Sequence, residues 1–363
     1  MIEKYYDGAI EQVAAGLGTV EKNYLLVRYS GQFSVENLND TKQLEKNEDI
    51  FVQVHEFETG EITCAYEPYL TMICDGFRRY MTGTFEEFME TCDVYYLHRP
   101  VLLGYFNQDN TGREEIILLD EVAYEQERML AALERMLCAI ADRHPVLFVL
   151  NRFQLASKST MQLTARFLKC ENCNIGLVLG VSDIQAMPEF LVPDWEMLYE
   201  TLDDGSKIYH IGNSGRKKEE TIDDEKYVDY GSEKVYRKLQ NMVEFLDFDQ
   251  AAYYLETIER KIKFDNLLVD DAARFRMWLL FVKVSILRQD IPKALEICED
   301  LEKIHLAGKE EECAYEQDYL IATAYMYQGK LKEALEMAGE TYRIAGKMSD
   351  DYRMFLSELL EAK

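Results

Sequence analysis

A short run without polar side chains constrains the middle of this chain more than any other feature. Residues 145–151 read Pro-Val-Leu-Phe-Val-Leu-Asn, an apolar segment that ends in a polar residue. A strand that is apolar at every position, rather than at every second one, is typical of a parallel sheet covered on both faces. We therefore expect this segment to be a buried strand with helices on both sides of its sheet.

Other segments fit the same architecture. Apolar runs that we predict to be strands occupy 24–29, 50–54, 175–179 and 208–211. Apolar residues at helical spacing predict helices near 67–81, 121–143 and 157–169. Strands that alternate with helices predict a three-layer α/β domain with a parallel sheet.

The chain is long enough for two domains, at 363 residues. Charged side chains concentrate after Gly212, in Arg216-Lys217-Lys218-Glu219-Glu220 and again in Asp223-Asp224-Glu225. Beyond this stretch, helical spacing dominates and no strand is convincing. We place an α/β domain over 1–215, a charged linker over 216–231 and a helical domain over 232–363.

The charge of the chain excludes one class of partner. The formal net charge is −27 and the sequence pI is about 4.6, whereas nucleic-acid binders need a basic face. No apolar run approaches the ~20 residues needed to span a bilayer. The opening residues, Met1-Ile2-Glu3-Lys4, are too charged for a secretory leader. We expect a cytoplasmic protein that binds neither nucleic acid nor membrane.

The helical part contains an approximate internal repeat. Lys293-Ala294-Leu295-Glu296 returns 40 positions later as Glu333-Ala334-Leu335-Glu336, and 249–252 is a weaker earlier copy. A period in this range indicates stacked pairs of helices.

Residues 121–183 resemble the AAA-superfamily signal-transduction ATPases of large bacterial regulators. In that family a strand such as Pro-Val-Leu-Leu-Val-Leu-Asp-Asp is followed by Leu-Gln-Trp-Ala-Asp. The segment 145–157 matches at Gln154 and Ala156, but Asn151 and Arg152 replace the two acids. The segment 65–69, Ala-Tyr-Glu-Pro-Tyr, is similar to the element that begins a helix in the same family. The resemblance covers roughly the first 200 residues and implies a P-loop-NTPase-like fold.

The phosphate loop of such an ATPase should follow the first strand. Its pattern, GxxxxGK[ST], supplies backbone N–H groups and a lysine for phosphate, and a hydroxyl for magnesium. The nearest match is 28–35, which keeps Gly31 but has Phe33, Ser34 and Val35 where the family has glycine, lysine and the hydroxyl.

With Asn151 and Arg152, these replacements remove the charged contacts to phosphate and magnesium. We expect no catalytic residue, no cofactor and no metal at this degenerate nucleotide site.

Residues 315–348 resemble a tetratricopeptide repeat. Four residues carry the resemblance: Ala322, Tyr325, Gly329 and Ala334. They fall where that repeat has a small residue, an aromatic residue, a turn glycine and a second small residue. The resemblance implies that the helical domain binds a protein or peptide partner on its concave face.

Two other sets of residues are weaker candidates. Cys170 and Cys173 have metal-ligand spacing, but a tetrahedral zinc site needs two more ligands and no second pair is evident. The five histidines are isolated in the sequence, so nothing selects one of them for catalysis.

These patterns predict a non-catalytic regulatory or scaffolding module of a bacterial signal-transduction protein. Related regulators place an output domain, such as a DNA-binding or diguanylate cyclase domain, after this pairing. Two alternatives stay open: an ATPase that uses unorthodox residues, and a small-molecule sensor whose remodelled pocket is lined by Phe33. The sequence does not identify the partner, the signal or the output.

Overall fold

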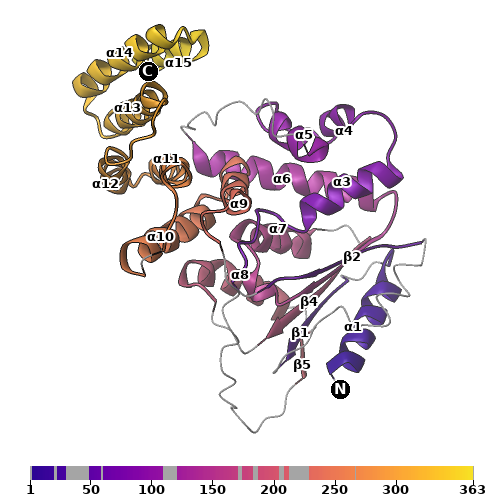
Figure 1. Cartoon of the computed structure of the whole chain (residues 1–363). Coiled ribbons are helices and arrows are strands. Elements are labelled where there is room, and N and C mark those ends of the chain that lie inside the picture. The colour runs from indigo at the N-terminus through magenta and orange to yellow at the C-terminus, as the bar shows by residue number, and fades with distance from the viewer. Residues whose placement is uncertain are drawn as a thin grey trace. The chain divides into compact units, whose positions relative to one another are not determined.

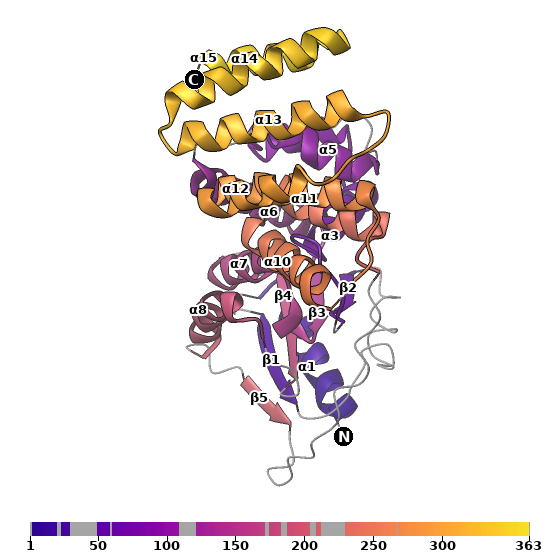
Figure 2. The same cartoon turned by 60° about the vertical axis from the view of Figure 1, so that its left-hand side comes forward.

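The computed structural model describes residues 2–19, 23–29, 49–58, 60–108, 121–170, 174–182, 187–203, 208–211, 229–265 and 267–362. The chain divides into two compact units (Figures 1 and 2). The first contains Met1–Glu115, Ala123–Val228 and Phe245–Asp247. The second contains Ile116–Val122, Asp229–Glu244 and Phe248–Lys363.

Five parallel strands form the sheet of the first unit within the described residues, in the order β2-β3-β4-β1-β5. The strands are β1 (Tyr24–Tyr29), β2 (Phe51–Glu56), β3 (Val146–Asn151), β4 (Ile175–Ser182) and β5 (Ile208–Ile211). All five lie where the sequence predicts strands, and β4 continues past Leu179 to Ser182. The expected parallel sheet is confirmed.

Helices cover both faces of this sheet (Figure 1). The helices of the unit are α1 (Ile2–Gly16), α3 (Tyr69–Tyr80), α4 (Phe85–Thr91), α5 (Arg99–Asn107), α6 (Val122–Ala141), α7 (Lys158–Lys169) and α8 (Val192–Asp203). Ile10 and Val13 of α1 pack on one face of the strands. On the other face, the ring of Tyr69 from α3 lies edge-on to Phe148 of β3, with centroids 4.7 Å apart. The fold is therefore α/β with a helix layer on each side.

The burial of β3 explains why its sequence is apolar throughout. Leu147 and Val149 join the core under α1, while Phe148 points to α3 on the opposite face. The neighbouring strand β4 keeps a glycine at Gly176, where a Cβ atom would lie 2.8 Å from Val13 and 3.0 Å from Leu147. Gly176 thus lets α1 approach the sheet closely.

The described part of the second unit is helical. Its helices are α9 (Glu233–Glu244), α10 (Phe248–Phe264), α11 (Asp271–Leu287), α12 (Ile291–Leu301), α13 (Glu310–Tyr327), α14 (Leu331–Met348) and α15 (Asp351–Ala362). Helix α13 packs with α14, and α14 with α15. Nowhere in the described residues is a helix both long enough and apolar enough to cross a membrane.

The internal repeat corresponds to a repeated helix start. Ala251, Ala294 and Ala334 are all buried and lie in the first turns of α10, α12 and α14. Each of these helices follows a turn residue of positive φ: Leu246, Gln289 and Gly329. The repeated sequence therefore lies at the start of a helix in each of the three places.

The hairpin of α13 and α14 contains the four residues of the repeat-like segment. Gly329 forms the turn with φ 79°, a conformation that glycine adopts without steric cost. Ala322 packs in a cluster with Ala338 and Leu360, and Ala334 is buried one turn before Ala338. The expected turn glycine and small buried residues are present in this hairpin.

Candidate functional site

The carboxyl ends of the strands bring the predicted site residues to one edge of the sheet. The last residues of β1, β2, β3 and β4 are Tyr29, Glu56, Asn151 and Ser182. Because the strands are parallel, these ends lie on the same edge, where open α/β sheets bind their ligands. Among the predicted positions, Asn151 and Arg152 lie here, whereas Gly31, Phe33, Ser34 and Val35 fall outside the described residues.

A buried hydrogen bond joins the ends of two strands that are not neighbours. The Tyr29 hydroxyl donates to Oδ1 of Asn151 over 2.7 Å, and both side chains are buried. Strand β4 lies between β1 and β3 in the sheet, so this bond crosses it. Burial raises the pKa of Tyr29 to about 12, which keeps the phenol protonated and able to donate at neutral pH. Asn151 therefore has a partner inside the protein for the oxygen atom that a metal would need.

Arg152 also meets an oppositely charged group. Its Nε lies 3.4 Å from Oε1 of Glu56, the last residue of β2. Arg152 has a positive φ of 52°, which is uncommon for a residue other than glycine. Both side chains are partly exposed, so solvent weakens the attraction between them. The pair places one cation and one anion beside Asn151, so their charges largely offset each other at this edge.

Gln154 ties the segment after β3 to the end of β4. Its Nε2 donates to the Ser182 carbonyl over 3.2 Å, and its Oε1 accepts from the Ser182 backbone N–H over 3.3 Å. Gln154 is one of the two residues that match the ATPase pattern. Its observed contact is with backbone, so in this chain it fixes the edge of the sheet.

The amino end of α7 is also occupied by groups of the first unit. The Ser157 hydroxyl caps the helix by accepting from the Thr160 N–H over 3.3 Å. The Ser159 N–H donates to Oδ2 of Asp247 over 3.0 Å, and Asp247 is buried. A helix amino end attracts anions, and here the anion is a carboxylate of the chain itself.

The weaker candidates form no recognisable catalytic set in the described residues. Burial lowers the pKa of His98, whose Nε2 lies 3.0 Å from Glu125 of α6. The thiols of Cys138 and Cys170 lie 3.6 Å apart, while Cys173 falls outside the described residues. Among the residues described, no three His, Cys, Asp or Glu side chains are grouped to hold a metal ion.

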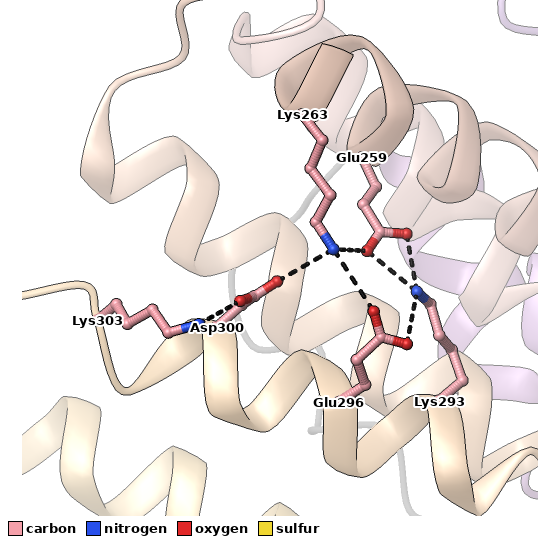
Figure 3. Close-up of polar contacts among 6 residues, drawn as sticks. All are labelled: Glu259, Lys263, Lys293, Glu296, Asp300 and Lys303. Carbon is pink, nitrogen blue, oxygen red and sulfur yellow. Dashed lines mark hydrogen bonds and ion pairs between the residues drawn. The ribbon is translucent and has the colours of Figure 1, made fainter.

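The second unit contains a dense charged cluster between α10 and α12 (Figure 3). Its members are Glu259, Lys263, Lys293, Glu296, Asp300 and Lys303. Glu259 is the buried centre, 2.7 Å from the ammonium of Lys263 and 2.9 Å from that of Lys293. The hydrogen bond that Lys263 donates to the Glu259 carboxylate raises the pKa of Lys263. The ion pairs that Lys263 of α10 makes with Glu296 and Asp300 of α12, and that Lys293 makes with Glu259, link the two helices.

Comparison of the chain with protein-family models, curated proteins and solved structures gives no match.

Proposed function

We propose that this protein is a non-catalytic regulatory module, in which an ATPase-like α/β unit is joined to a helical unit that binds a protein partner. The observation that carries the proposal is the hydrogen bond between Tyr29 and Asn151. In a P-loop NTPase, the strand corresponding to β3 would supply a carboxylate to magnesium. In this chain the strand ends in a neutral amide that already accepts a hydrogen bond.

The surroundings of Asn151 support the same proposal. Arg152 and Glu56 form a pair beside it, and Gln154 is held by the end of β4. The described polar groups at this edge therefore have partners within the chain. A regulatory module needs only a stable α/β scaffold at this edge of the sheet, and these contacts stabilise that edge.

The helical unit supports the choice of a protein partner. Recurring hairpins with small buried residues at their starts are characteristic of repeat arrays, which present extended surfaces to other proteins. The acidic composition favours a partner with a basic surface. An output domain attached to the same chain would fit this role.

Calorimetric titration of the full chain with magnesium-ATP and magnesium-GTP tests the proposal. We expect no affinity tighter than about millimolar, or roughly −4 kcal/mol, because Ser34 and Asn151 stand where the ATPase pattern has the phosphate-binding lysine and the magnesium-binding acid. The matched variant Asn151→Asp restores the acid at β3 and should still not bind. A micromolar dissociation constant for the natural chain would instead favour the unorthodox ATPase.

A further inference from the structure

Helix α15 has one buried apolar face and one exposed apolar face. Leu356, Ser357 and Leu360 are buried, and the Ser357 hydroxyl accepts from Thr341 of α14 over 3.0 Å. Leu360 packs with Ala338 of α14. These contacts account for the attachment of α15 to α14 and identify its inner face.

The outer apolar face consists of Tyr352, Phe355 and Leu359, here called the α15 stripe. Their exposed fractions are 46%, 57% and 37%. The spacing i, i+3 and i+7 places the three side chains along one side of the helix. Single exposed apolar residues are ordinary, but an aligned set on one helix is typical of a surface that another helix covers.

The charges of α15 define what would fit this stripe. Its one cation, Arg353, is paired with Glu316 at 2.9 Å and with Asp350 at 3.1 Å. Asp351 and Glu358 are exposed and have no ion-pair partner among the described residues. On the helix surface these two acids lie beside the stripe, because Asp351 precedes Phe355 by four residues and Glu358 follows it by three. The stripe is therefore bordered by unneutralised negative charge.

We propose that the α15 stripe binds an amphipathic helix of a partner protein that carries Lys or Arg beside its own apolar face. The apolar contacts supply the driving force, and the acids select the charge of the partner. A second copy of this chain fits less well, because its α15 presents the same acids and the whole chain carries a charge of −27. This inference rests on the proposed function, since it names the kind of partner.

The probe is a synthetic amphipathic helix made of Leu and Lys, titrated against the full chain by fluorescence anisotropy. A Leu/Glu peptide with the same apolar spacing tests the charge preference, and a scrambled Leu/Lys peptide tests the need for a helical stripe. We expect only the amphipathic Leu/Lys peptide to bind, with an affinity that falls as salt rises.

Variants of exposed residues locate the contact. Phe355→Ser and Leu359→Ser should each weaken binding at least about tenfold, as loss of a central apolar anchor does. The matched control is Leu268→Ser, which changes a residue of the same unit that is 94% exposed and lies outside α15. It should leave the affinity unchanged. Glu358→Gln should weaken binding by about threefold and reduce its dependence on salt.

Three results would overturn the proposal: equal binding of the Leu/Glu or scrambled peptide, equal binding by the Phe355→Ser and Leu268→Ser variants, or no binding at all. Sedimentation of the full chain supplies a fourth. Self-association that Phe355→Ser abolishes would assign the stripe to a second copy. None of these results bears on the magnesium-ATP titration, so failure of this inference is distinguishable from failure of the proposed function.

Discussion

The carboxyl edge of the sheet and the α15 stripe differ in how far their side chains contact other groups of the chain. At the sheet edge, Tyr29 and Asn151 bind each other and Arg152 lies against Glu56. On α15, the side chains of the stripe are exposed to solvent. The first region has a recognisable motif pattern and the second has none. Polar side chains at a motif position can therefore be occupied by contacts within the fold, whereas exposed apolar side chains leave binding energy available for a partner.

The two regions differ for a physical reason. A buried polar group without a partner costs about 1–3 kcal/mol, so replacing a charged site residue requires new partners within the fold. An exposed apolar side chain carries little penalty for folding and can remain uncovered. Mutations in the two regions should therefore have opposite effects on stability and on binding.

The largest expected difference is between two phenylalanines. Phe148→Ala removes a fully buried ring from β3 and should lower the free energy of unfolding by roughly 3–5 kcal/mol. Phe355→Ala, on the α15 stripe, should change it by less than about 0.5 kcal/mol. Urea denaturation of the two full-length variants measures both effects. Comparable losses of stability would mean that α15 is covered in the folded chain and that the comparison is wrong.

A smaller effect is expected for the bond between β1 and β3. Asn151→Ala leaves the Tyr29 hydroxyl buried without its acceptor and should cost about 1–3 kcal/mol. Tyr29→Phe should cost a similar amount, and the two losses should not add in the double variant, because one hydrogen bond is removed in both cases. A double-mutant cycle of denaturation free energies provides the measurement. Strict additivity would show that the two side chains are not energetically coupled.

The smallest expected effect on stability concerns Asp318, a partly buried acid of the helical unit that lies near other acids. Burial, together with the nearby Glu340 and Glu302, raises the pKa of Asp318 of α13 from 3.8 to about 6. The charged carboxylate therefore destabilises the folded state: the penalty is absent below the unfolded pKa, grows as pH rises, and is complete above about pH 6.

Asp318→Asn should stabilise the chain at pH 7.5 by about 1 kcal/mol, a value reduced for partial exposure, and the gain should shrink towards pH 4. Thermal unfolding across this range tests the prediction. Glu311→Gln, at an exposed position of α13, is the matched control and should show little dependence on pH. A gain that is independent of pH would rule out burial of charge as the cause.

The centre of the sheet was predictable because β3 is apolar at every position before Asn151 and is buried throughout. The apolar run at 146–150 predicted a buried strand of a parallel sheet, and Val149 is buried as expected. Helix α1 was not predicted. Its apolar residues Ala9, Ile10 and Val13 form a short stripe within a segment interrupted by Gly8, and glycine weakens helical propensity.

The candidate site was predictable only in part. Asn151 and Arg152 were found because a known pattern pointed to their positions. Tyr29 and Glu56 were missed because their importance depends on the order of strands, which brings residues distant in sequence to one edge. The visible signal was that polar or hydroxyl-bearing residues end several apolar strands, but it selects a site only once those ends are known to align.

The order of strands also has a consequence for folding during synthesis on the ribosome. Strand β1 pairs with β4, and Tyr24 lies opposite Leu177. At a translation rate of about 5–20 residues per second, Leu177 is synthesised roughly 8–30 s after Tyr24. During that interval Leu25, Leu26 and Val27 lack the strand that will later pair with them. The nascent first unit should therefore be a client of chaperones that shield apolar segments until β4 emerges.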